Sequence, residues 1–195
     1  IAFEGGEGSG KTTQARLVAI WLRELGYDVV TTHEPGATKI GMRLRALLLD
    51  TSHTGMSPRA EALMYAADRA EHVASVIAPA LARGAVVITD RYVDSSLAYQ
   101  GAGRGLGVDV VLKLNLRVVE GLLPDVTVLV ELDVETALSR VGGKRDRIER
   151  ADAAFWPVVA EAYRELAARF PERYVVVDGR LPVEELAAEV RDRLR

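Results

Sequence analysis

Residues 5–12 read GGEGSGKT, and this stretch matches the pattern G-x-x-x-x-G-K-[ST]. A short apolar run, 1–3, precedes it, and a helical pattern follows from Thr12 to Leu25. Glycines between a strand and a helix let backbone N–H groups turn inward around phosphate oxygens, and the positive end of the helix points at the same anion. The stretch therefore predicts a phosphate-binding loop rather than an ordinary glycine-rich turn.

The rest of the chain alternates short apolar runs with longer helical patterns. Further strands are expected at 29–32, 85–89, 126–132 and 174–177, and helices at 39–49, 58–83 with a kink at Pro79, 109–122, 134–140, 152–170 and 183–194. Strands separated by helices imply parallel pairing with right-handed crossovers. The pattern predicts an α/β fold in three layers, with a five-stranded parallel sheet and helices on both faces. Segments 95–107 and 140–150 are expected to be loops.

Composition restricts the class of protein. The 195 residues show no linker, repeat or low-complexity tract, so one domain, 1–195, is expected. The net charge of −3 argues against a nucleic-acid partner, and no apolar run reaches the roughly 18–20 residues of a membrane span. The chain has no cysteine, which excludes disulfides and cysteine-ligated metals and fits a cytoplasmic location. Because Ile1 is not Met, the natural start is expected upstream.

Two further features bear on nucleotide chemistry. Asp90 ends an apolar strand, where an acidic side chain can help hold the Mg²⁺ of a bound nucleotide. The single asparagine, Asn115, is followed by Leu116, so the chain lacks the Asn-Lys-x-Asp motif with which switch GTPases read guanine. The phosphate loop thus indicates that the chain binds ATP or GTP, and the missing motif argues against a GTPase switch.

The motifs together resemble the bacterial thymidylate kinase family over nearly the whole chain. Beyond the phosphate loop, the resemblance is carried by EPG at 34–36, DR at 68–69, DRY at 90–92, AYQGAGRG at 98–105 and DRIE at 146–149. It implies a P-loop NTPase fold with a short basic lid at about 140–150. It also implies that the protein phosphorylates dTMP to dTDP with ATP and Mg²⁺. That lid segment holds five basic and two acidic residues.

The resemblance implies four groups of site residues. The expected catalytic residues are Lys11, Glu7, Arg91 and Arg145, with Arg140 or Lys144 as alternates to Arg145. The expected ATP-binding residues are Gly5, Gly6, Glu7, Gly8, Ser9, Gly10, Lys11, Thr12, Thr13, Arg140 and Arg147. The expected dTMP-binding residues are Glu7, Arg45, Tyr65, Arg69, Arg91, Ser95, Ser96, Tyr99 and Gln100, and the expected Mg²⁺ ligands are Thr12 and Asp90.

Within the resemblance, each substrate contact has a stated role. Arg91 and Arg45 correspond to arginines that hold the acceptor phosphate, and arginine suits this because its planar fork binds phosphate bidentately. Glu7 corresponds to a contact to the sugar 3′-hydroxyl, in the subclass whose catalytic arginine comes from the lid. Tyr65 corresponds to the ring that stacks on thymine, although an alternative is a core aromatic on a helix face.

The remaining expected contacts concern the base and the sugar. Arg69 corresponds to a donor to thymine O4, Ser96 and Gln100 to polar contacts at the pyrimidine edge, and Tyr99 to the ring that disfavours ribose. Buried polar groups that match one base penalise others by leaving donors unpaired.

Two departures from the family pattern stand out, and two other functions are possible. His33 and Ala37 occupy positions where the family has arginine and glycine. His53 and His72 have no other metal-ligating residues near them in the sequence and are interpreted as structural or surface residues.

The alternative functions are a kinase for another nucleoside monophosphate or a deoxynucleoside, and a non-catalytic ATP-binding regulator. The resemblance also implies a homodimer.

Overall fold

The computed structural model describes residues 1–140, 142 and 146–195. The strands of the sheet are β1 (Ala2–Glu4), β2 (Val29–His33), β3 (Val86–Asp90), β4 (Thr127–Glu131) and β5 (Tyr174–Asp178). The α-helices are α1 (Lys11–Glu24), α2 (Lys39–Leu49), α3 (Pro58–His72), α4 (Ala78–Ala82), α5 (Val93–Ser96), α6 (Val108–Val118), α7 (Val134–Arg140), α8 (Phe155–Arg169) and α9 (Val183–Arg193). Two π-helical segments complete the described elements, η1 (Val73–Ile77) and η2 (Leu97–Gly103).

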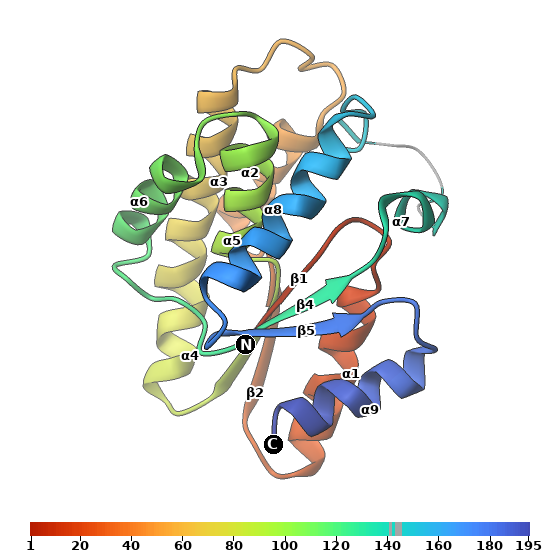
Figure 1. Cartoon of the computed structure of the whole chain (residues 1–195). Helices are drawn as coiled ribbons and strands as arrows, with labels where there is room; N and C mark the ends of the chain where they lie inside the picture. Colours follow the sequence, from red (N-terminus) through yellow and green to blue (C-terminus); the bar gives the residue numbers. More distant parts are fainter. Residues whose placement is uncertain (141, 143–145) are drawn as a thin grey trace.

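The five strands form one parallel sheet in the order β2-β3-β1-β4-β5. β1 is the central strand, so its carboxyl end lies between those of β3 and β4 (Figure 1). In open parallel sheets of this kind, ligands bind beyond the carboxyl ends of the strands, where the strand order changes direction. The predicted five-stranded parallel sheet is confirmed, and its order places residues 5–12 at that position.

Helices cover both faces of the sheet, as the apolar strands required. Successive residues of a strand point to opposite faces, and accordingly Ala2 belongs to one apolar core and Phe3 to the other. The core containing Phe3 is closed by α1 and α9, through residues such as Val18 and Leu186 (Figure 1). The second core is closed by α4, α6 and α8 together with α5 and η2. The three-layer arrangement follows from strands that are apolar on both sides.

The expectation of a loop at 95–107 was wrong for residues 95–103, because α5 and η2 make residues 93–103 helical, and it is confirmed for residues 104–107. Glycines and polar residues suggested a loop, but the glycines serve close packing. A Cβ on Gly103 would lie 2.5 Å from the Phe155 ring, so only glycine lets η2 approach α8 this closely. Leu97, Ala98 and Tyr99 are buried in the same contact. Tertiary packing therefore overrode local composition.

The predicted helix 58–83 is divided into α3, η1 and α4, and the change in winding comes before Pro79 rather than at it. Proline cannot donate a backbone hydrogen bond, and its ring displaces the carbonyl four residues earlier. The wider π-helical turn at Val73–Ile77 lies next to that displaced carbonyl.

Across the part of the chain that is described, no helix has the length and apolar character needed to cross a membrane.

Candidate active site

The phosphate loop runs from the carboxyl end of β1 to the first residue of α1. Gly8 has a φ of +74°, and a Cβ there would collide with the Ala137 carbonyl oxygen, so both the left-handed conformation and the space require glycine. Lys11 opens α1 and is 6% exposed, and its Nζ donates to the Gly6 carbonyl oxygen at 3.2 Å. The ammonium is thus held across the loop, beside the positive end of the helix.

Glu7 balances the cations of the loop. Its carboxylate pairs with Arg91, and its Oε2 lies 3.8 Å from Lys11 Nζ. The nearby Arg91 guanidinium, followed by the Lys11 ammonium, lowers the pKa of Glu7 to about 2. Burial and the charge of Arg91 lower the pKa of Lys11, and Glu7 opposes that shift. Two cations and one carboxylate leave a positive site, which suits bound phosphates.

Arg91 follows β3 in a conformation that is rare for a residue with a side chain, with a φ of 70°. Its Nη1 donates to the Gly5 carbonyl oxygen at 3.3 Å and to Ser95 Oγ at 3.0 Å. The guanidinium also lies over the Tyr99 ring, 5.1 Å from the centroid. Arg91 is therefore held in advance, next to both the phosphate loop and the start of α5.

Glu4 is a site residue that sequence analysis missed. Its buried Oε1 accepts from the backbone N–H groups of Tyr92 (2.8 Å) and Ser95 (3.1 Å), and Oε2 accepts from Ser95 Oγ (2.6 Å) and Tyr163 OH (2.9 Å). Burial, together with the charge of Asp94, raises the pKa of Glu4 to about 7. Glu4 fixes the backbone on the carboxyl side of Arg91. The available signal was an acidic residue at the end of an apolar strand.

Thr12 and Asp90, the two predicted Mg²⁺ ligands, are in contact. Thr12 Oγ1 is hydrogen-bonded to Asp90 Oδ2, while Asp90 Oδ1 is buried without a hydrogen-bond partner among the described residues. No group of three or more His, Asp or Glu side chains that could hold a metal ion occurs among residues 1–140, 142 and 146–195. One hydroxyl and one carboxylate with an unused oxygen fit Mg²⁺, which retains water and phosphate ligands instead of requiring a protein cage.

A cavity of about 580 Å³ lies beside the phosphate loop. It brings together all of the predicted contacts to dTMP and the metal, together with the predicted catalytic residue Lys11. The lining residues among these predictions are Glu7, Lys11, Thr12, Arg45, Tyr65, Arg69, Asp90, Arg91, Ser95, Ser96, Tyr99 and Gln100. Arg45 is exposed, and its Nη1 donates to the Pro35 carbonyl oxygen at 2.8 Å. Asp146 and Glu149, which belong to the DRIE motif, also line the cavity.

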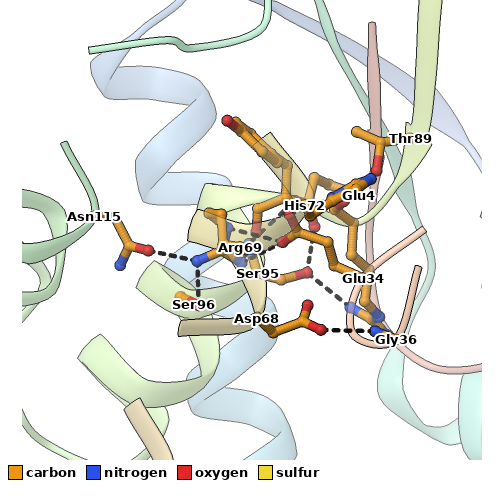
Figure 2. Close-up of polar contacts among 12 residues, drawn as sticks. Glu4, Glu34, Gly36, Asp68, Arg69, His72, Thr89, Ser95, Ser96 and Asn115 are labelled. Carbon is orange, nitrogen blue, oxygen red and sulfur yellow. Dashed lines mark hydrogen bonds and ion pairs between the residues drawn. The ribbon is translucent and has the colours of Figure 1, made fainter. Parts of the chain in front are cut away.

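Arg69 reaches the cavity wall, but its donors are used within the protein. Nε donates to Glu34 at 2.8 Å, Nη1 donates to Ser96 at 3.0 Å and also to Asn115, and Nη2 donates to the Tyr92 carbonyl oxygen at 2.9 Å (Figure 2). Nη2 also pairs with Glu34 at 2.7 Å. The five N–H groups therefore have acceptors within the protein, and the expected donation of Arg69 to thymine O4 stays a prediction. Sequence spacing could not show these distant partners.

Two predicted lid residues are described, and they differ in position. Arg140 lies beside the phosphate loop, close to Gly8, and its Nη1 donates to the Gly179 carbonyl oxygen at 3.0 Å. Arg147 instead donates to the Leu48 carbonyl oxygen at 2.6 Å and pairs with the buried carboxylate of Glu61 at 2.7 Å. Its Nη2 is buried without a hydrogen-bond partner among the described residues, and the role of Arg147 in ATP binding stays a prediction. The predicted catalytic Arg145 and its alternate Lys144 lie outside the described residues.

The histidines and Ala37 have structural explanations. His72 is buried between Glu34 (2.8 Å) and Thr32 (2.6 Å), and the exposed His53 lies 3.9 Å from Asp50. His33 lines the cavity, where burial, followed by the charge of Arg45, lowers its pKa. Within the described chain, positive φ values at residues other than glycine occur at Arg91 and Glu120, so Ala37 fits its turn without that strain.

Comparisons with known proteins agree on one family. The family model described as thymidylate kinase matches residues 3–190. A thymidylate kinase of Leifsonia xyli subsp. xyli is 53% identical, covering 100% of this chain and 93% of that protein. One of Geobacillus thermodenitrificans is 46% identical, covering 97% and 86%. The crystal structure of thymidylate kinase from Ehrlichia chaffeensis superimposes with a TM-score of 0.82 at 32% identity, covering 100% of this chain and 97% of that one.

Proposed function

The chain belongs to the thymidylate kinase family, with the P-loop NTPase fold, and from that premise we propose how its residues carry out the reaction. The chain is a phosphotransferase that phosphorylates dTMP to dTDP with ATP as the phosphoryl donor. We propose that residues 1–195 act as one kinase domain. The observation that carries the assignment of the site is the pair of cations, the buried Lys11 and the partly exposed Arg91, which line a cavity together with aromatic and polar groups.

Charge neutralisation is the main task of this site. Phosphoryl transfer passes through a loose transition state with charge on the equatorial oxygens, and the acceptor is itself a phosphate dianion. Lys11 neutralises the phosphates of ATP, and Arg91 holds the dTMP phosphate with its planar fork, assisted by Arg45. Glu7 keeps Lys11 and Arg91 paired before substrates bind and accepts a hydrogen bond from the sugar 3′-hydroxyl. Arg140 and Arg145 contribute further cations from the lid.

We propose that Thr12 and Asp90 hold Mg²⁺. The support is the Thr12–Asp90 contact together with the buried, unpartnered Oδ1 of Asp90, which can accept a hydrogen bond from metal-bound water. When bound, Mg²⁺ neutralises charge on the β- and γ-phosphates. The phosphate loop, residues 5–12, and the neighbouring Thr13 supply the backbone N–H groups that orient these phosphates.

The thymine base is proposed to lie at the end of the cavity lined by Tyr65, Ser96, Tyr99 and Gln100. Tyr65 is half-buried, and burial raises the pKa of its hydroxyl, which stays neutral. Ser96 Oγ accepts from Arg69 and keeps its own proton for a carbonyl of the base. Ser95 supports Arg91, and Tyr99 lies under the Arg91 guanidinium, near the expected position of the sugar.

Tyr65→Leu is expected to weaken dTMP binding about tenfold or more, because stacking of a base on an aromatic ring contributes about 1–3 kcal/mol. The KM for ATP should stay within about twofold. Isothermal titration with dTMP and steady-state kinetics measure the two effects. Tyr65→Phe is the matched control and should retain dTMP affinity, since it keeps the ring. Unchanged dTMP affinity in Tyr65→Leu would make Tyr65 a packing residue.

A coupled assay of ADP release tests the substrate assignment. Offered dTMP, dUMP, CMP, AMP, GMP and thymidine, the protein should turn over dTMP with the highest kcat/KM. Fastest turnover of another monophosphate or of thymidine would refute the choice of substrate. ADP release that does not depend on any acceptor would instead point to an ATP-binding regulator.

We further propose a homodimer that acts in the cytoplasm. Three neighbouring helices each expose a large apolar side chain: Met42 on α2, Leu63 on α3 and Val110 on α6. Apolar side chains grouped on adjacent helices favour association with a second copy. Leu63→Glu should therefore halve the mass measured by analytical ultracentrifugation, whereas Leu25→Glu, an exposed position just after α1, should not change it. A monomeric unsubstituted protein would contradict the proposed dimer. Fractionation of the cells that produce the protein tests the proposed cytoplasmic location.

A further inference from the structure

Glu61 is a buried carboxylate that the reaction described above does not use. It lies in the first turn of α3 and is 1% exposed, with both oxygens engaged. Oε1 accepts from Gln100 Nε2 at 2.9 Å and from Arg104 Nε at 3.1 Å, and Oε2 pairs with Arg147 Nη1 at 2.7 Å. One side chain therefore joins α3 to η2, to Arg104 just after η2 and to Arg147 in the predicted lid.

The carboxyl group of Glu61 is ionised at neutral pH. Burial pushes its pKa upward, but hydrogen bonds from Gln100 and Arg104, together with the charge of Arg104, outweigh burial, so the pKa lies below its ordinary value. An ionised carboxylate has no proton to give and can only accept hydrogen bonds.

This restriction fixes the orientation of the Gln100 side chain. An amide has a donating nitrogen and an accepting oxygen, and the acceptor-only carboxylate selects the nitrogen. The amide oxygen is therefore directed away from Glu61. Gln100 also lines the cavity, beside Tyr65 and Ser96. The side chain consequently presents an acceptor to a bound base.

Pyrimidines differ in what they present to such an acceptor. Thymine carries a donating N3–H between two carbonyls, whereas cytosine has an accepting N3 beside an amino group. We propose that Glu61 is a positioning residue for base selectivity, which holds the Gln100 amide oxygen toward N3 of the base so that the cavity selects dTMP against dCMP. The inference rests on the proposed function, because it assumes that the base lies beside Gln100.

The test is the ratio of kcat/KM for dTMP to that for dCMP. Glu61→Gln is isosteric, but its amide can bond to Gln100 in either orientation, which frees Gln100 to turn its nitrogen toward the base. The ratio should fall about tenfold or more, mainly through a higher KM for dTMP, because the site then offers a donor where thymine also donates. Gln100→Leu should lower the ratio similarly. The double variant should fall no further than either single variant, since the two residues act through one contact.

Arg104→Met is the matched control. It removes another hydrogen bond to the same Glu61 oxygen and retains an apolar chain over the Phe155 ring, but it leaves the Gln100 contact intact. Its ratio should match that of the unsubstituted protein. An unchanged ratio in folded Glu61→Gln would overturn the inference, and so would an equal fall in Arg104→Met. An unchanged ratio in Gln100→Leu would also overturn it, even if Glu61→Gln does not fold. If the unsubstituted protein did not prefer dTMP in the panel of acceptors, the proposed function would fail as well.

Discussion

Lys11→Ala is expected to lower kcat about 10³-fold or more. The Lys11 ammonium lies across the phosphate loop, and in the substitution the negative charge of the transferring group loses a fixed cation in a water-poor site. Removal of one preorganised charge partner costs about 10²–10³ in rate, and a full charge next to the reacting group belongs at the upper end of that range. The KM for dTMP should change much less, because dTMP is held by other residues.

The stability of the same variant separates lost chemistry from lost structure. Burial and the charge of Arg91 lower the pKa of Lys11, so its ammonium is unfavourable in the unliganded protein. Lys11→Ala should therefore have a Tm at least equal to that of the unsubstituted protein when no nucleotide is present. Arg193→Ala, at an exposed position in the last turn of α9, is the control and should leave kcat unchanged. A kcat within tenfold of the unsubstituted value would show that Lys11 is not the main cation.

Local patterns in the sequence identified those parts of the protein whose conformation is set by residues adjacent in the chain. The phosphate loop, the strand ending at Asp90 and the five apolar runs were predictable, because backbone turns and strand burial follow from adjacent residues. The family resemblance then supplied the substrate. The cavity brings together twelve predicted contacts, from Glu7 in the loop to Gln100 in η2.

Sequence patterns were less informative where distant residues decide the contacts of a side chain. The guanidinium of Arg147, which is expected to bind ATP, pairs with Glu61, which lies 86 positions away in the chain. The donors of Arg69 are taken by Glu34 and Asn115 in the same way. A charged side chain that becomes buried requires a partner, and spacing along the sequence does not tell which carboxylate will provide it. Glu4 and Glu61 were overlooked for the same reason.

Arg91→Lys is expected to lower kcat/KM for dTMP by about 10²-fold. Lysine keeps the positive charge but cannot donate through a planar fork, and bidentate recognition of phosphate depends on that geometry. The left-handed backbone at Arg91 and the two backbone hydrogen bonds to Glu4 fix the position from which the side chain starts, so a flexible ammonium cannot reproduce the arrangement. The KM for ATP should rise less than the KM for dTMP.

Arg45→Lys provides the comparison for Arg91→Lys. Arg45 is exposed and donates to the Pro35 carbonyl oxygen, so its contribution to phosphate binding is reduced by solvent. The loss in kcat/KM should be about tenfold or less. Arg91→Gln, which removes the charge as well as the fork, should lose more activity than Arg91→Lys. If Arg91→Lys and Arg45→Lys had equal effects, or if Arg91→Lys raised only the KM for ATP, Arg91 would not be the main contact to the acceptor phosphate.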